Sequence, residues 1–210
     1  MMQQPQTLKE KQRLERENLI LQEAEDAFLE KGFYETSMDE IAARVGIAKG
    51  TVYLHFPCKE DLVIALFTRS MEQCLTQIEE ISATQQNVED KLKAIIKFIY
   101  TGMHSKQAQL MGAIFNSGNL KRLFSEKGKP VQELMHVLLA RIADLLEEGR
   151  QKGEFDATIP TNGMLLALIN IFSFKSMNKN VINVEINNED MIQYLEHIYF
   201  NGIKAHNTQK

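Results

Sequence analysis

A short polar run combines groups that bind phosphate oxygens, and it consists of Lys49, Gly50, Thr51, Val52 and Tyr53. Its lysine offers a charged donor, its threonine and tyrosine offer hydroxyl donors, and its glycine lets the backbone approach a partner closely. The run lies within residues 41–59, a window that has three cations and no acid. Because the whole chain of 210 residues has a net charge of −4, the sequence predicts a local anion-binding surface.

Two short helices are predicted to position this run. The first begins with a capping box, in which the Ser37 hydroxyl caps the Glu40 amide and the Glu40 carboxylate reaches back. It ends at the turn 46–48, after which a second helix directs Val52 and Phe56 inward. The pair has the arrangement of a helix-turn-helix, whose second helix presents its N-terminal residues to the major groove of DNA. Two short helices alone are also compatible with a helical hairpin that has a polar face.

The rest of the chain also predicts helices, because apolar residues recur at helical spacing without strand alternation or internal repeats. Four prolines and eleven glycines are too few for a turn-rich all-β fold. The fold class is therefore all-α, with a continuous helix near residues 61–80 at the domain boundary. The expected helices are one that ends at Gly32, the short pair, and then 61–82, 90–104, 106–116, 130–152, one that opens at Pro160, and 189–206.

Residues 24–62 contain a set of residues at fixed spacing: Gly32-Phe33, Thr36-Ser37, Ile41-Ala42, Gly46-Ile47, Lys49 to Tyr53, His55-Phe56 and Lys59 to Leu62. This segment resembles the N-terminal domain of TetR/AcrR-type transcriptional regulators. The resemblance implies an N-terminal three-helix helix-turn-helix DNA-binding domain, residues 1–60, and a C-terminal helical ligand-binding and dimerisation domain, residues 61–210. It further implies a homodimer that represses by binding a palindromic double-stranded DNA operator. The dimer is then released from the operator when a small molecule binds the C-terminal domain. The DNA contacts that it implies are Thr36, Ser37, Lys49, Gly50, Thr51, Tyr53, His55 and Lys59.

Two positions depart from the family pattern. Ala48 replaces a serine and is a poor N-cap, which costs about 1 kcal/mol. Cys58 stands where serine, asparagine or aspartate is usual, and a lowered pKa and oxidation of this thiol, at a helix N-terminus near Lys59, are one interpretation of the change. A tolerated substitution is the favoured interpretation of Cys58.

Further cations lie outside the matched run. Arg44 is a candidate phosphate contact, with a plain surface role as the equal alternative. The N-terminal cations are candidates for wrapping the DNA backbone or entering a minor groove, but the glutamates between them favour a frayed, solvated helix. These cations are Lys9, Lys11, Arg13 and Arg16.

The C-terminal region carries adaptable methionine and phenylalanine side chains that are candidates for lining a cavity for a lipophilic ligand. Ordinary core packing is the alternative for each of them. Three polar residues are candidate anchors in the same cavity. The whole ligand-binding set is Phe67, Met71, Phe98, Met103, His104, Met111, Phe115, Asn116 and Asn170.

Two C-terminal helices are expected to pair with their copies in a second protomer. Residues 163–174 are apolar on nearly every side, and the last helix carries a long apolar stripe. Closure of a monomeric core is the alternative. A four-helix interface about a two-fold axis would place the helix-turn-helix pairs of the two protomers one DNA turn apart, about 34 Å. The predicted interface residues are Leu165, Leu168, Ile169, Phe172, Met191, Leu195, Ile198, Tyr199 and Gly202.

Other classes find little support in the sequence. No nucleotide-binding loop or hydrolase motif is present, the five histidines lack metal-ligand spacing, and two cysteines make no disulfide framework. We therefore expect no enzyme activity, no metal and no cofactor. No membrane span or secretory signal is found, and the expected location is the cytoplasm. The alternative function is a helical protein-interaction module without DNA binding.

Overall fold

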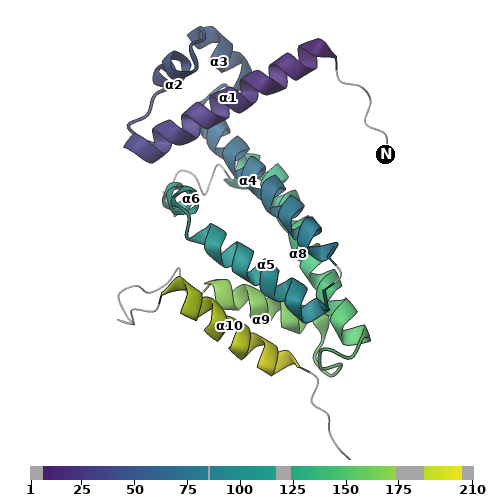
Figure 1. Cartoon of the computed structure of the whole chain (residues 1–210). Helices are drawn as coiled ribbons and strands as arrows, with labels where there is room; N and C mark the ends of the chain where they lie inside the picture. Colours follow the sequence, from purple (N-terminus) through teal and green to yellow (C-terminus); the bar gives the residue numbers. More distant parts are fainter. Residues whose placement is uncertain (1–6, 85, 117–123, 174–186, 205–210) are drawn as a thin grey trace, which may run out of the picture. The chain divides into compact units, whose positions relative to one another are not determined.

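The computed structural model describes residues 7–84, 86–116, 124–173 and 187–204, and all the regular structure in these ranges is helical apart from one isolated bridge. The all-α prediction is therefore confirmed. No helix in the described ranges is both long and apolar enough to cross a lipid bilayer. The helices are α1 (Leu8–Lys31), α2 (Met38–Val45), α3 (Lys49–His55), α4 (Lys59–Ser82), α5 (Val88–Met103), α6 (Lys106–Asn116), α8 (Lys129–Gln151), α9 (Thr161–Ser173) and α10 (Asn188–Ile203) (Figure 1).

The chain divides into two compact units, and α4 passes from the first unit into the second after Ser70. The first unit consists of residues 1–70 and 105–132, and the second consists of residues 71–104 and 133–210. The boundary predicted at residues 60 and 61 lies in the same continuous helix. The functional division into 1–60 and 61–210 stays a prediction.

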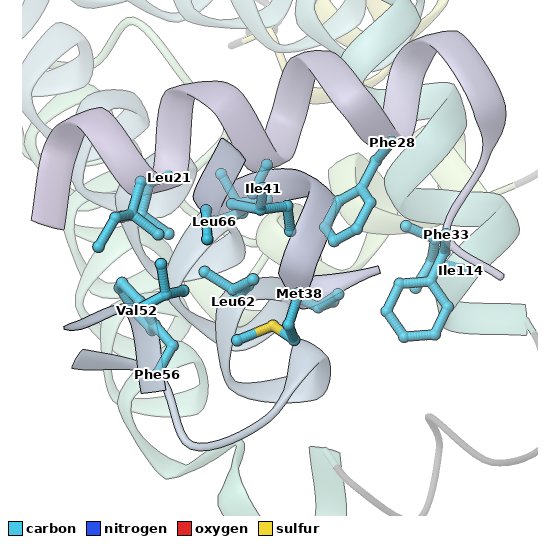
Figure 2. Close-up of a cluster of buried hydrophobic side chains, with 14 of the residues drawn as sticks. Leu21, Phe28, Phe33, Met38, Ile41, Val52, Phe56, Leu62, Leu66 and Ile114 are labelled. Atoms are coloured by element: carbon cyan, nitrogen blue, oxygen red, sulfur yellow. The ribbon is translucent and has the colours of Figure 1, made fainter. Parts of the chain in front are cut away.

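The first unit is built around an apolar core that is shared by α1 to α4. Phe28 of α1, Ile41 of α2 and Val52 of α3 are fully buried, and Leu62 of α4 lies in the same cluster (Figure 2). Ile114 of α6 also belongs to this cluster. Three helices that could not bury their apolar faces alone thus close on one another and on α4.

Local sequence signals fix the ends of the first two helices. Gly32 and Gly46 have φ angles of +87° and +75°, a region that glycine enters without steric cost. The backbone N–H of Gly46 donates to carbonyl oxygens at the end of α2, so this glycine forms the turn toward α3. Ser37 caps α2 by accepting a hydrogen bond from the Glu40 amide at 3.1 Å, as predicted.

The second unit is a helical bundle in which α10 packs on α5 and α9 (Figure 1). Its core cluster includes Leu92 of α5, Leu146 of α8 and Met164 of α9. The Glu154 carboxylate accepts hydrogen bonds from the first two amides of α5, at 3.0 and 3.2 Å, and so stabilises the start of that helix.

Candidate nucleic-acid interface

The helix-turn-helix has the predicted geometry: α2 and α3 are joined by residues 46–48, and Val52 and Phe56 are buried. Ala48 makes no side-chain cap at the start of α3, as expected from its methyl group. The opposite surface of α3 is open to solvent and carries Lys49, Gly50, Tyr53 and Leu54, with Thr51 half-buried beside them. Ser37 is also exposed, at the start of α2. We call the α3 residues Lys49, Gly50, Thr51, Tyr53 and Leu54 the reading face.

Leu54 is a residue of this face that the predicted DNA-contact set omits. It is 84% exposed, although a leucine on a short helix is usually directed into a core. The signal in the sequence is its place two residues after the buried Val52, which turns it away from the core. An exposed leucine beside cations and hydroxyls can contact the methyl group of thymine.

The charge on the reading face is less concentrated in space than in the sequence. The amino group of Lys49 lies 2.7 Å from the carboxylate of Asp39 in α2, and this hydrogen bond raises the pKa of Lys49. Both side chains are exposed, and such a pair contributes about 0–1 kcal/mol. A phosphate can therefore replace the carboxylate at little cost in free energy.

Arg44 is held by two acids, with its guanidinium 2.5 Å from Glu30 and 3.2 Å from Glu40. These hydrogen bonds raise its pKa. The Glu40 carboxylate also lies 2.7 Å from the amino group of Lys31. Glu40 thus binds two cations, and the predicted return bond of the capping box to the backbone of Ser37 is wrong.

Thr36 and Lys59 use their polar groups inside the first unit. Thr36 is only 2% exposed, and its hydroxyl donates to the carbonyl oxygens of Ala27 and Gly32. The amino group of Lys59 donates to the carbonyl oxygens of Phe33, Tyr34 and Thr36, and burial lowers its pKa. Both side chains therefore fix the turn between α1 and α2. Their DNA contacts stay a prediction.

His55 connects α3 to α1. Its side chain is 8% exposed, and Nδ1 lies 3.0 Å from the Glu17 carboxylate. Burial opposes ionisation of Glu17, but the hydrogen bonds from His55 and Arg13 outweigh it and lower the pKa of Glu17. His55 thus positions the end of α3, and its direct DNA contact stays a prediction.

The structure contradicts the alternative of a lowered pKa for Cys58. Partial burial and a hydrogen bond from its Sγ to the Asp61 carboxylate, at 3.0 Å, raise the pKa of the thiol. A nearby carboxylate disfavours the thiolate, and the amino group of Lys59 is bound to carbonyl oxygens instead. The structure thus favours the interpretation of Cys58 as a tolerated substitution.

The predicted ligand-binding residues fall in both units. Phe67 packs edge-on against Phe124 in the first unit, whereas Met71, Phe98, Met103, His104 and Asn170 belong to the second. Of these, Asn170 is exposed and donates to the carbonyl oxygen of Leu166 at 2.8 Å. The side chains of Met111, Phe115 and Asn116 lie outside the described residues. The ligand-binding role of the set stays a prediction.

The predicted interface residues point in different directions. Ile198 is 66% exposed and Gly202 is exposed, but Tyr199 is 3% exposed and donates its hydroxyl to the carbonyl oxygen of Met164. Burial raises the pKa of Tyr199. Leu168 is likewise buried inside the unit, so these two residues are not interface candidates in this structure. Leu165, Ile169, Met191 and Leu195 are half-buried, and the side chain of Phe172 lies outside the described residues.

The prediction omitted two exposed apolar residues, Leu166 of α9 and Tyr194 of α10. The signal for Tyr194 was present in the sequence of α10. Ile192, Tyr199 and Ile203 share one helical face, which the structure buries, and this face leaves Tyr194 and Ile198 together on the other side.

Comparison with known proteins covers both units. The family model described as "Bacterial regulatory proteins, tetR family" matches residues 20–66, and the model described as "YsiA-like protein, C-terminal region" matches residues 67–198. The "Fatty acid metabolism regulator protein" of Bacillus subtilis is 29% identical over 138 residues, which cover 64% of this chain and 68% of that protein.

Solved structures share the fold. A transcriptional regulator of the TetR/AcrR family from Thermobifida fusca has a TM-score of 0.74 at 19% identity, covering 90% of this chain and 98% of its own. The regulator FadR from Bacillus subtilis, solved in complex with stearoyl-CoA, has a TM-score of 0.69 at 21% identity, covering 89% of this chain and 98% of its own.

Proposed function

Because this chain belongs to the TetR family and is a DNA-binding transcriptional regulator, we propose that it acts as a homodimer on a palindromic operator, with α3 of each protomer in a major groove. The observation that carries the proposal is the reading face on α3 of the helix-turn-helix. The family is not an enzyme class, and its match favours DNA binding over the alternative of a protein-interaction module.

Each group of the reading face has a role in this proposal. Lys49 exchanges the Asp39 carboxylate for a phosphate, and the Tyr53 hydroxyl donates to a second phosphate. Gly50 and Thr51 lie at the N-terminal end of α3, which approaches the base edges in this docking geometry. Leu54 supplies an apolar contact to a thymine methyl.

The proposed dimer forms through the exposed apolar residues of α9 and α10. Leu166, Tyr194 and Ile198 expose large apolar side chains, and the exposed Gly202 allows close approach of a second helix. Symmetric pairing of two such helices gives a self-complementary four-helix interface. The two-fold axis would also match the symmetry of a palindromic operator.

The proposed effector is a lipophilic molecule of the long-chain acyl class, and its binding releases a repressed operator. Support comes from the match of residues 67–198 to the YsiA-like C-terminal region and from the name of the Bacillus subtilis relative. The stearoyl-CoA bound to FadR gives a concrete probe. The effector must bind the DNA-free form more tightly, because equal affinity for both forms shifts nothing.

The first experiment identifies the operator by sequencing the genomic DNA fragments that the purified protein retains. On that operator, Lys49→Ala and Tyr53→Phe should weaken binding without a change in helicity or oligomeric state. Lys11→Ala, which removes the same charge from an exposed position of α1, is the matched control for Lys49→Ala. Unchanged affinity in both variants would overturn the assignment of the reading face.

The effector is tested on the same operator with stearoyl-CoA and with free coenzyme A as control. The expected result is release of DNA and an increase in melting temperature with stearoyl-CoA only. If stearoyl-CoA causes neither DNA release nor a higher melting temperature, or if free coenzyme A causes the same effects, the acyl class is contradicted. Reporter expression with and without the protein then decides between repression and activation.

A further inference from the structure

The N-terminal half of α1 forms a free helical extension of the first unit. Residues 8–16 are all exposed, and the first buried residue of the helix is Ile20. At 1.5 Å per residue, the exposed part extends about 13 Å beyond the core. Figure 1 shows this end of α1 projecting past α2 and α3.

The extension is a regular helix, in contrast to the frayed one expected from the sequence. A complete capping box closes its start: the Thr7 hydroxyl accepts from the Glu10 amide, and the Glu10 carboxylate accepts from the Thr7 amide at 2.7 Å. The same bonds lower the pKa of Glu10. A fully capped terminus holds the helical side chains in fixed register.

This register gathers three cations on one side of α1. At about 100° per residue, Lys9, Arg13 and Arg16 fall within an arc of about 60°. Lys11 and Glu15 lie on the opposite side of the helix. The described residues contain no ion pair or hydrogen bond of Lys9 or Arg16, so both charges are free for a partner.

The acids at the edge of this cationic side already have partners. Glu10 is bonded to Thr7 in the capping box, and Glu17 is bonded to His55 and to Arg13, with Nε of the arginine at 3.0 Å. Of the glutamates that dilute the positive charge in the sequence, Glu17 is paired with Arg13 and Glu15 lies on the other side of the helix, whereas Glu10 stays an ionised carboxylate that caps the start of α1.

The cationic side is continuous with the reading helix. Glu17 contacts His55 at the end of α3, and Arg13 lies one turn before Glu17 on the same side of α1. The major groove is about 12 Å wide, so a helix that extends about 13 Å past this contact spans the distance from the groove to a bordering phosphate backbone.

We propose that Lys9, Arg13 and Arg16 form a phosphate-binding side of α1 that grips the DNA backbone flanking each half-site. This proposal rests on the proposed function and adds a second surface to it. The contact is independent of base sequence, because phosphates carry no sequence information. It extends the footprint of each protomer beyond the bases that α3 reads.

The test compares two operator duplexes: one that ends at the operator edges and one that is extended by one helical turn, about 10 base pairs, on each side. The variants are the double substitution Lys9→Gln with Arg16→Gln, and Lys11→Gln as the matched control on the opposite side of the helix. Affinity is measured over a range of salt concentrations, and melting temperature and circular dichroism verify that each variant folds.

The wild type and Lys11→Gln should bind the extended duplex more tightly and with a steeper salt dependence. The double variant should not show this gain. Its salt exponent, the magnitude of the slope of log affinity against log salt concentration, should fall by about 0.9 for each phosphate that it no longer neutralises. Equal salt exponents for the wild type and the double variant, or an equal reduction with Lys11→Gln, would overturn the proposal. Failure of the wild type to bind either duplex would instead overturn the proposed operator binding.

Discussion

The helices α3 and α10 both present large apolar side chains to solvent, but their surroundings differ. On α3, Tyr53 and Leu54 share the exposed surface with Lys49, whose exposed ion pair is easily exchanged. On α10, Tyr194 and Ile198 share a side that carries no cation. Exposure alone therefore does not identify a partner, because a phosphate backbone requires nearby positive charge and a second copy of an apolar helix does not.

The largest expected effect comes from placing a charge on the exposed side of α10. Ile198→Arg should give a folded monomer, since this side chain is outside the core, and operator affinity should fall by about 100-fold or more with the loss of bivalent binding. Light scattering and operator titration measure the two effects. Gln193→Arg, an exposed position elsewhere on α10, is the control and should remain dimeric. A dimeric Ile198→Arg protein would remove the distinction between the two surfaces.

A second prediction separates residues that bind DNA from residues that position the reading helix. Thr36→Val removes the internal hydrogen bonds of the Thr36 hydroxyl and should lower the free energy of unfolding by about 1–3 kcal/mol, with an unchanged salt exponent for operator binding. Lys49→Ala should leave the free energy of unfolding nearly unchanged, but it should lower operator affinity and reduce the salt exponent. Chemical denaturation and salt titration distinguish them. A reduced salt exponent in Thr36→Val would restore Thr36 as a phosphate contact.

The apolar part of the reading face can be tested with modified DNA. Leu54→Ala should weaken operator binding by about fourfold, which corresponds to roughly one buried methylene group, about 0.8 kcal/mol. Replacing each thymine in the operator by uracil, which lacks the methyl group, identifies the contacted base. At that base the two changes together should weaken binding no more than either alone. Fully additive losses at every thymine would show that Leu54 touches no methyl group.

The smallest expected effect concerns the contact between α1 and α3. The pKa of Glu17 is lowered below its ordinary value of 4.5 in the folded protein. A lowered carboxyl pKa stabilises the fold above that ordinary value, and this stability is lost as the pH falls through the folded pKa. Glu17→Gln should therefore be less stable than the wild type at pH 7 by about 1 kcal/mol, with the difference shrinking below pH 4. A constant difference across this range of pH would exclude ionisation of Glu17 as its cause.

The helices of this protein were predictable because their ends carry local signals. Gly32, Gly46 and Ser37 act on their own neighbours in the chain, and the structure confirms each of them. The outward direction of α3 was also predictable, because Val52 and Phe56 lie one helical turn apart and define the buried side.

The use of individual polar groups was not predictable in the same way. The partner of Lys59 lies 23 to 26 residues away in the chain, and the partner of His55 lies 38 residues away. Such pairs form only after helices pack, so a window of sequence without acids says little about charge in space. The pairing of Lys49 with Asp39 illustrates this, because the acid lies just outside the window of residues 41–59.

The first compact unit is discontinuous in the chain, since residues 105–132 complete it after α5 has already been made. Ile114 and Phe124 belong to the same apolar core as residues of α1, α2 and α3. During synthesis, a nascent chain that ends before residue 105 therefore carries α1 to α3 with part of their apolar core uncovered. A protein fusion that transplants only residues 1–70 onto another effector domain would inherit that uncovered surface and should supply an apolar replacement for these two side chains.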